Sequence, residues 1–214
     1  MKAKSLLIAG AALAASLMTS KAQVYSQNIV GYINVPLNAG YNLVANQLDL
    51  DGTGTNNTIQ TVLSTNLPNK TLVYAWNGAG FSSAQYASSS GTWSGVTAAV
   101  TNAMQPGEGF FIKVPVSTNL TLVGNVITGT NSYPILAGYN IVAPSAPVAG
   151  TIDTTNGFTP SIKDTISVWN GSGFNTYQYS STGWSPSDPQ IPVGAAVFLN
   201  SRVNTNWTQV LNVQ

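Results

Sequence analysis

Residues 40–45 read Gly-Tyr-Asn-Leu-Val-Ala, and residues 138–143 repeat this stretch as Gly-Tyr-Asn-Ile-Val-Ala. A second block, Trp-Asn-Gly-Ala-Gly-Phe at 76–81, returns as Trp-Asn-Gly-Ser-Gly-Phe at 169–174. Three further blocks return in the same order: Trp93-Ser94 as Trp184-Ser185, 107–112 as 194–199, and 123–126 as 210–213. Self-similarity that keeps its order indicates two diverged copies of one structural unit, and this decides the architecture.

The two copies differ mainly in the length of their loops. The offset between matching blocks falls from 98 residues at the first block to 87 at the last, so the second copy has the shorter loops. A Gly/Thr/Asn/Ser stretch at 128–132 is typical of a short linker. We therefore assign repeat 1 to residues 23–128 and repeat 2 to residues 129–214.

Short runs rich in Val, Ile, Leu and aromatic residues, bounded by Gly, Pro and Asn, predict strands. The Trp-Asn-Gly-x-Gly-Phe block predicts a tight turn, because Asn and Gly tolerate positive φ. A short helix is expected at 59–63, entered through Thr58, whereas Pro160 limits its counterpart at 158–162 to one turn. The sequence thus predicts an all-β fold of two tandem small antiparallel β-sandwich or barrel-like repeats after an N-terminal signal helix. The strands predicted in the first copy are 29–37, 41–46, 72–76, 81–86, 109–114 and 120–126.

The first 22 residues have the layout of a secretory signal peptide. Lys2 and Lys4 precede an apolar run at 6–18, and Ser20 and Ala22 stand at the −3 and −1 positions of a cleavage site. The apolar run is shorter than the roughly 20 residues that a membrane-spanning helix needs. We therefore expect cleavage before Gln23 and export to the cell surface or the medium, with no transmembrane span in the mature chain.

Charge is scarce in this sequence. Only 6% of the residues are charged, against about 25% in ordinary soluble domains. Removal of residues 1–22 leaves four basic residues against six acidic ones, a net charge of −2. This balance gives no electrostatic reason to expect a nucleic-acid partner. The chain has no Cys, so packing and backbone hydrogen bonds must hold the fold, although an exported environment permits disulfides.

The sequence also lacks most side chains that catalysis uses. It has no His and no Cys, which removes the usual base and thiol of nucleophilic catalysis and the usual zinc ligands. A hydrolase using paired carboxylates is the weaker alternative. Glu108 is the one Glu, and the second copy has Ala195 at its position. We therefore predict a non-enzymatic protein that needs no cofactor.

The repeated blocks together resemble an uncharacterised secreted two-copy β-module family of Gram-negative environmental bacteria. The resemblance rests on the order Gly-Tyr/Trp-Asn-Leu-Ile/Val, then Trp-Asn-Gly-x-Gly-Phe, then Pro-Gly-x-Gly-Phe-Phe-x-Lys at 106–113. It extends over nearly all of the mature chain, although residues 194–197 of the second copy lack the second Gly and the Lys. It implies surface adhesion, matrix or sorting roles and carries over no catalytic residue.

Aromatic residues are the main candidates for ligand contact. Trp93 and Trp184 lie in Ser/Thr/Gly-rich segments, so we expect them to be exposed, whereas Trp76 and Trp169 end alternating strands and fit a core. Exposed rings beside neutral Asn, Gln and Thr would suit an uncharged glycan, and core packing is the alternative use of such rings. The candidate glycan site comprises Trp93, Trp184, Tyr86 and Tyr179.

Residues 49–52 read Asp-Leu-Asp-Gly, in which alternating oxygen ligands precede a Gly as in calcium-binding loops. Asp49 and Asp51 are therefore a candidate calcium site. The terminal Glu of a complete calcium loop is absent, and the second copy has Pro-Val-Ala-Gly at 147–150. The alternative is a polar loop whose Asp side chains bind nearby backbone groups.

These observations predict a secreted or cell-surface, non-enzymatic structural or interaction protein that serves in matrix, adhesion or assembly. The alternative is a neutral-carbohydrate-binding protein that uses its loop aromatics. We expect its partners to be an extracellular glycan or other surface proteins, and not nucleic acid. Unprotected strand edges would be available for pairing between copies.

Overall fold

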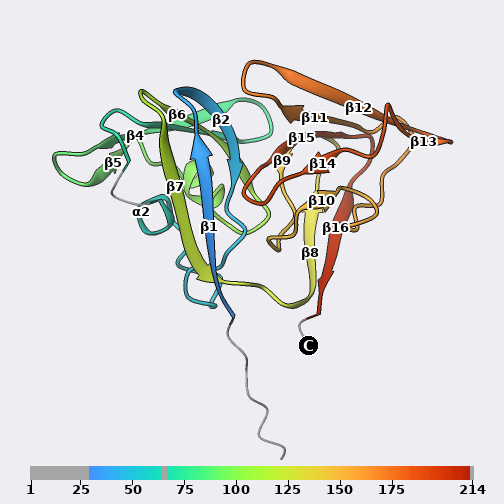
Figure 1. Cartoon of the computed structure of the whole chain (residues 1–214), viewed down its shortest axis with the longest axis horizontal. Helices are drawn as coiled ribbons and strands as arrows, with labels where there is room; N and C mark the ends of the chain where they lie inside the picture. Colours follow the sequence, from blue (N-terminus) through green and yellow to red (C-terminus); the bar gives the residue numbers. More distant parts are fainter. Residues whose placement is uncertain (1–28, 64–66, 213–214) are drawn as a thin grey trace, which may run out of the picture.

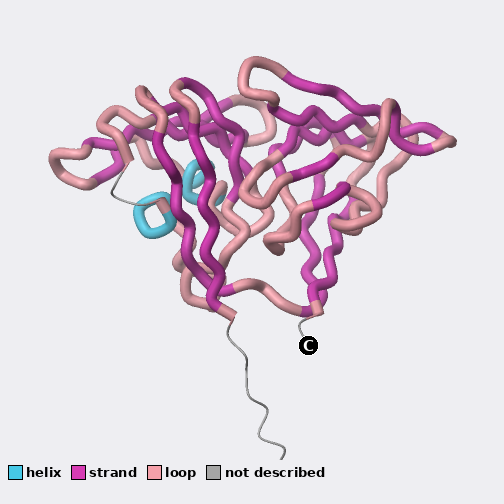
Figure 2. The backbone as a smooth tube through the Cα atoms, in the orientation of Figure 1, coloured by secondary structure: helices cyan, strands magenta, loops and turns pink. Residues whose placement is uncertain are grey.

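The computed structural model describes residues 29–63 and 67–212, and the predicted signal peptide at 1–22 lies outside this part of the chain. The described residues are 5% helical and 49% strand, which confirms the predicted all-β class. Strands dominate the backbone in both halves, and the helices of the described residues are short (Figure 2). The sheets fall into two antiparallel sets in a repeated arrangement (Figure 1).

The elements follow the repeat in the sequence. The first copy contains β1 (Val30–Leu37), β2 (Gly40–Ala45), α2 (Ile59–Val62), β3 (Leu72–Trp76), β4 (Phe81–Ala87), β5 (Thr92–Ser94), α3 (Ala98–Asn102), β6 (Gly109–Val114) and β7 (Thr118–Asn125). The second copy contains β8 (Gly129–Ile135), β9 (Gly138–Val142), β10 (Gly150–Thr151), β11 (Thr165–Trp169), β12 (Phe174–Ser180), β13 (Gly183–Ser185), β14 (Gln190–Ile191), β15 (Val197–Ser201) and β16 (Thr205–Leu211).

Each copy pairs its strands in the same order. A five-stranded sheet has the order β2-β6-β3-β4-β5 in the first copy and β9-β15-β11-β12-β13 in the second. A two-stranded ribbon, β1–β7 or β8–β16, accompanies each of these sheets, and the second copy adds the pair β10–β14. Each of these sheets is built from strands of one copy only, so none of them combines strands from before and after residue 128. In neither copy do the described strands close into a ring.

The core of each copy lies between its ribbon and its five-stranded sheet. In the first copy Ile33 and Leu122 of the ribbon join Phe110 and Ile112 of the sheet in one buried cluster. The second copy repeats this with a cluster that includes Trp207 of its ribbon and the buried side chains of β11 and β15. Alternating side chains on each strand therefore supply one apolar face to a two-layer sandwich.

The predicted helix near 59–63 is confirmed as α2. Its N-cap is Thr58, whose hydroxyl accepts a hydrogen bond from the backbone N–H of Thr61 at 3.3 Å. This cap satisfies one of the backbone donors that a helix start leaves unpaired. The counterpart segment around Pro160 forms no helix, as expected from the missing N–H of proline.

Two predictions from the sequence were wrong, and one helix was missed. The expected linker at 128–132 is mostly strand, because β8 pairs along its whole length with β16, from Gly129 opposite Leu211 to Ile135 opposite Thr205. Trp93 and Trp184 lie in strands β5 and β13 rather than in loops. Helix α3, capped by Thr97, was not predicted from the sequence.

The two copies meet through reciprocal contacts. The backbone N–H of Ala45 donates to the carbonyl of Gly194 at 2.9 Å, and that of Ala143 donates to the carbonyl of Gly107 at 2.9 Å. The repeat aligns Ala45 with Ala143 and Gly107 with Gly194, so each hydrogen bond is the image of the other. Such reciprocity is the mark of an isologous interface with approximate twofold symmetry. Its buried side chains are Leu43, Ala45, Ile141, Ala143 and Ala196.

Gln47 adds an unsymmetrical link across the same interface. Its side chain is fully buried, and its amide donates to the carbonyls of Pro144 and Ala146 at 2.9 and 3.2 Å. Its carbonyl oxygen accepts from the backbone N–H of Gly194 at 2.7 Å. One side chain of the first copy therefore binds three backbone groups of the second. Two of them, the Pro144 carbonyl and the Gly194 N–H, have no other partner among the described residues, whereas the Ala146 carbonyl also accepts from the N–H of Val148 at 2.8 Å.

Candidate functional site

Trp93, expected to be exposed, is only 8% exposed and belongs to the core of the first copy. It lies opposite Tyr86 in the β4–β5 pair, and the two ring centroids are 5.2 Å apart. Tyr86 is itself 1% exposed. The expected exposure was wrong because Trp93 lies in β5, an edge strand of the sheet, and not in a loop. In this strand its side chain points into the core.

Trp184 and Tyr179 form the matching pair in the second copy, with ring centroids 5.2 Å apart. Both are half-buried, and Trp184 packs against the core of its copy. The buried indole N–H groups of Trp93 and Trp184 have no hydrogen-bond partner among the described residues. Since β5 and β13 lie at opposite edges of the molecule (Figure 1), the four predicted glycan-contacting residues do not form one surface.

In the loop that contains Asp49 and Asp51, both carboxylates accept hydrogen bonds from nearby backbone N–H groups, as in the polar-loop alternative to a calcium site. The buried Asp49 carboxylate accepts from the backbone N–H of Gly54 at 2.9 Å and from the Asn57 amide at 3.0 Å. Asp51 accepts from the backbone N–H of Thr53 at 2.9 Å, and hydrogen bonds from Thr53 lower the pKa of Asp51. Across residues 29–63 and 67–212, no three acidic, His or Cys side chains gather to hold a metal ion.

A cluster of aromatic rings across the two copies was not predicted. Phe111 of β6 lies 6.0 Å from Phe198 of β15, measured between ring centroids. The contacts around this pair are reciprocal, since Phe111 lies 5.7 Å from Trp169 and Phe198 lies 6.5 Å from Trp76. We call this cluster the aromatic platform; it comprises Tyr41, Trp76, Phe81, Phe111, Tyr139, Trp169, Phe174 and Phe198.

The outer rings of the platform face solvent. Four of them are substantially exposed: Tyr41 at 43%, Phe81 at 48%, Tyr139 at 59% and Phe174 at 41%. Alternation along β3 could have predicted the position of Trp76 from the sequence. Val73 and Ala75 point into the core, so Trp76 lies on the opposite face of the sheet. Each Trp of the turn block also lies directly opposite its Phe, Trp76 with Phe81 and its counterpart likewise.

An open hollow of about 360 Å³ lies on the platform. Tyr74 lines this hollow, and the second copy has Ser167 at the equivalent position. The platform therefore has one more aromatic ring beside it in the first copy than in the second copy. The ammonium of Lys113 lies 4.9 Å from the centroid of the Tyr41 ring, within the range of a cation–π contact. The lining residues are Tyr41, Tyr74, Phe81, Phe111 and Trp169.

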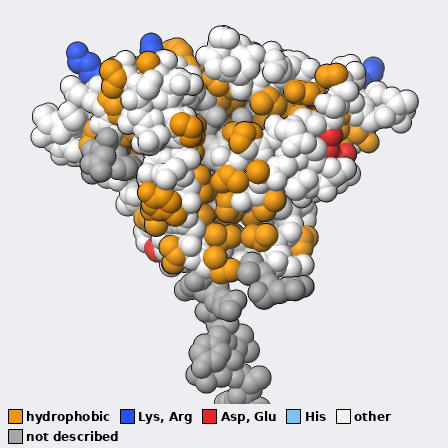
Figure 3. All heavy atoms as spheres, viewed as in Figure 1, with side chains coloured by type: hydrophobic (Ala, Val, Ile, Leu, Met, Phe, Trp, Pro, Cys, Tyr) orange, Lys and Arg blue, Asp and Glu red, His pale blue; other side chains and the backbone are white. Residues whose placement is uncertain are grey.

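Apolar side chains also reach the surface on the ribbons. Tyr32 and Val123 form an exposed cross-strand pair on β1–β7. Figure 3 shows hydrophobic side chains gathered over the middle of one face, with the few charged ones at its margins. This face is therefore mostly neutral, in keeping with the low charge content of the sequence.

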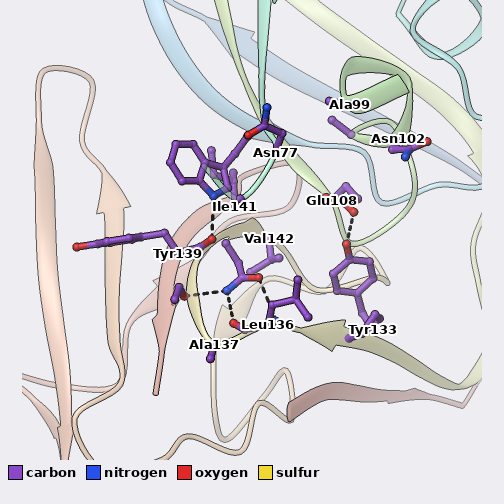
Figure 4. A pocket seen from close by; sticks show the side chains of 16 residues that line it. Asn77, Ala99, Asn102, Glu108, Tyr133, Leu136, Ala137, Tyr139, Ile141 and Val142 are labelled. Atoms are coloured by element: carbon purple, nitrogen blue, oxygen red, sulfur yellow. Dashed lines mark hydrogen bonds between the residues drawn. The ribbon is translucent and has the colours of Figure 1, made fainter. Parts of the chain in front are cut away.

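A cleft of about 690 Å³ opens between the two copies (Figure 4) and shares Trp76 and Tyr139 with the platform. We call it the inter-repeat cleft. Residues from α3, from the end of β3 with its turn, and Glu108 just before β6 line one side, and β8, β9 and their turn line the other. The Tyr133 hydroxyl of the second copy donates to Oε1 of Glu108 of the first. Its polar and aromatic side chains include Trp76, Asn77, Asn102, Glu108, Tyr133, Tyr139 and Asn140.

Burial controls the ionisation of this pair. Burial raises the pKa of Glu108, and the hydrogen bond from Tyr133 opposes this shift only in part. Burial and the neighbouring Glu108 carboxylate raise the pKa of Tyr133, so its hydroxyl keeps its proton as a hydrogen-bond donor. The cleft therefore holds one carboxyl group in a setting that disfavours its charged form.

Among the described residues there is no helix with the length and apolar character needed to cross a membrane. No protein-family model, curated protein or solved structure matches the chain. The resemblance to a two-copy β-module family consequently stays a prediction.

Proposed function

We propose that this chain is an exported, non-enzymatic interaction protein that acts at the cell surface or in the extracellular matrix through its aromatic platform. The single observation that carries the proposal is the exposure of four large rings, two from each copy, around the Phe111–Phe198 contact. Contiguous exposed apolar surface of this kind is characteristic of interaction sites.

The energetics favour a contact surface. A large aromatic side chain presents about 150–250 Å², so covering a half-exposed ring removes roughly 100 Å² from water. At about 25 cal/mol per Å², each covered ring would stabilise a complex by roughly 2 kcal/mol. Aromatic residues are also the side chains most enriched among those that dominate binding energy at protein interfaces.

The platform offers little to catalysis. Its rings carry no acid, base or nucleophile apart from the tyrosine hydroxyls, and the whole sequence lacks His and Cys. The earlier alternative, a glycan site at Trp93 and Trp184, loses its basis because Trp93 is buried and the two rings lie at opposite edges. Interaction is thus the role that the exposed residues support best.

Export and association can be tested with the full chain in a Gram-negative host. We expect cleavage near Gln23, protein outside the inner membrane, and association of the purified product with washed host cells or with itself in sedimentation velocity. A Phe81→Ser/Phe174→Ser variant should be exported equally but lose at least tenfold in association. The matched control is Ile162→Ser/Val203→Ser, which alters two exposed apolar side chains outside the platform.

Three results would contradict the proposal. Retention of the uncleaved chain in the cytoplasm would contradict export. Equal association of the platform variant and the unmodified protein would contradict the role of the platform. A panel of nitrophenyl esters and glycosides should show no turnover above the buffer rate, and turnover by the purified chain would contradict a non-enzymatic role.

A further inference from the structure

We propose that the inter-repeat cleft is a binding site for a short neutral saccharide, held by Asn77, Asn102 and Glu108 against the indole wall of Trp76. The inference deepens the proposed interaction function by giving it a small-molecule ligand, and it rests on that function only in being non-catalytic. The cleft's volume of about 690 Å³ lies within the roughly 300–1,000 Å³ typical of small-molecule sites.

The cleft presents hydrogen-bonding groups that the fold leaves unused. The side chain of Asn102, the last residue of α3, makes no hydrogen bond to any described residue. Asn77 uses only its oxygen, which accepts from the backbone N–H groups of Ala79 and Gly80 at 3.0 and 2.8 Å. Glu108 uses only Oε1, toward Tyr133. Amide N–H groups and carboxyl oxygens in one cleft match sugar hydroxyls, which both donate and accept.

The charge of the cleft points to a neutral ligand. Its lining contains no Lys or Arg, so nothing there would neutralise an anion. Glu108 is its one ionisable carboxyl group, and burial raises the pKa of that group. A site that disfavours the ionised carboxylate binds a cation weakly at mildly acidic pH. The same carboxyl group can form hydrogen bonds with sugar hydroxyls whether it is protonated or ionised.

The wall of the cleft is held by both copies. The indole N–H of Trp76 donates to the carbonyl of Tyr139 at 2.8 Å, which fixes the ring across the boundary between the repeats. A ring fixed in this way offers an apolar face beside the polar groups, at no further cost of ordering when a ligand binds. Aliphatic C–H groups of a sugar ring would pack on this face, while its hydroxyls reach the amides.

The second copy supplies an internal comparison. The repeat aligns Glu108 with Ala195 and Tyr133 with Val35, and the described part of the second copy has no helix in place of α3, which carries Asn102. Val35 packs against the core of the first copy, and a Cβ placed on Gly194 would lie only 2.4 Å from it. The polar pair is therefore not needed for the fold of the module, because apolar residues fill the same place in its twin. Side chains that folding does not require are the ones available for binding.

The experiment is saturation-transfer NMR and calorimetry on the purified mature protein, with glucose, galactose, N-acetylglucosamine, maltotriose and cellotriose as neutral probes. Glucuronate and glucosamine serve as anionic and cationic probes. We expect at least one neutral probe to bind, and Asn102→Ala and Glu108→Ala each to weaken that binding at least tenfold. Ala is the residue the second copy carries at the position of Glu108, so the fold should accept it.

The controls separate this site from the platform. Asn170→Ala alters the twin of Asn77, and Phe174→Ser alters a platform ring that packs on Phe111, Trp169 and Phe198; both should leave saccharide binding unchanged. The inference is overturned if no neutral probe binds, if glucosamine alone binds and depends on Glu108, or if the two cleft variants bind as well as the unmodified protein. Loss of binding in the platform variant alone would overturn the cleft while supporting the platform.

Discussion

Glu108 is the residue whose environment makes the sharpest prediction about pH. Because burial raises its pKa above the ordinary 4.5, the folded protein binds this proton more tightly than the unfolded chain does. Its contribution to stability is therefore fully present below about pH 4.5 and is lost as the pH rises through the folded-state pKa. We expect the free energy of unfolding of the unmodified protein, relative to Glu108→Gln, to fall across this interval.

Urea denaturation at a series of pH values between 4 and 8 measures this difference. Referring each value to Glu108→Gln cancels the titration of the other carboxylates, which the two proteins share. Tyr133→Phe removes the hydrogen bond that lowers the pKa of Glu108, so its loss of stability should extend to higher pH. A difference between the two proteins that rises with pH would contradict the assigned burial of Glu108.

Gln47 makes three hydrogen bonds across the contact between the copies. Gln47→Leu keeps the volume of the side chain but leaves the carbonyl of Pro144 and the N–H of Gly194 without a partner, while the carbonyl of Ala146 keeps the N–H of Val148. We expect it to lower the free energy of unfolding by about 3 kcal/mol, since each unsatisfied buried group costs about 1–3 kcal/mol before relaxation. Gln85→Leu, on an exposed position of β4, should change it by less than about 0.5 kcal/mol. Equal midpoints in urea for the two variants would refute this role.

At the scale of elements, the sequence predicted most of the strands and missed what depends on distant partners. The first-copy runs and the Trp-Asn-Gly-x-Gly-Phe turns carry local signals of hydrophobicity and turn chemistry. The strand β8 does not, because its Thr, Asn and Ser residues look like a linker until β16 pairs with them. Trp93 was misjudged for the same reason, since its burial follows from the pairing of β5 with β4. Tertiary pairing overrides local propensity in such segments.

The strand β6 makes a prediction at this scale through its first residue, Gly109. A Cβ there would lie 2.4 Å from the Cβ of Ala196 and 2.7 Å from Cγ2 of Ile141. The repeat aligns Gly109 with Ala196, so one twin is small to make room for the other. We expect Gly109→Ala to destabilise the protein by about 1–3 kcal/mol through overpacking. Gly80→Ala has open space and an ordinary φ, and it should be tolerated; thermal unfolding of the two variants compares them.

At the scale of the whole molecule, the interface between the copies should couple their unfolding. The cluster of Leu43, Ile141 and Ala196 is buried only while both copies are folded, so unfolding one copy would expose apolar surface on the other. We expect tryptophan fluorescence and far-UV circular dichroism to report coincident transitions in urea. Two separated transitions would mean that the copies are stabilised independently.

The candidate sites belong to this scale too, which is why the sequence did not predict them. The sequence identified the repeat and its conserved turn blocks, but not how one copy faces the other. The platform needs Phe111 and Phe198 to meet, and the cleft needs Tyr133 to reach Glu108. Neither contact leaves a periodic or local pattern, because each joins residues of different copies.

The reciprocal hydrogen bonds of Ala45 with Gly194 and of Ala143 with Gly107 have a consequence for how the protein can evolve. A homodimer built on the same interface would be bound by its symmetry, because every mutation would change both halves at once. Here the halves are encoded separately, so the position that is Val35 in one copy can be Tyr133, a lining residue of the inter-repeat cleft, in the other. Duplication followed by fusion thus releases each half from copying its twin, and a new specificity can arise on one side without a loss on the other.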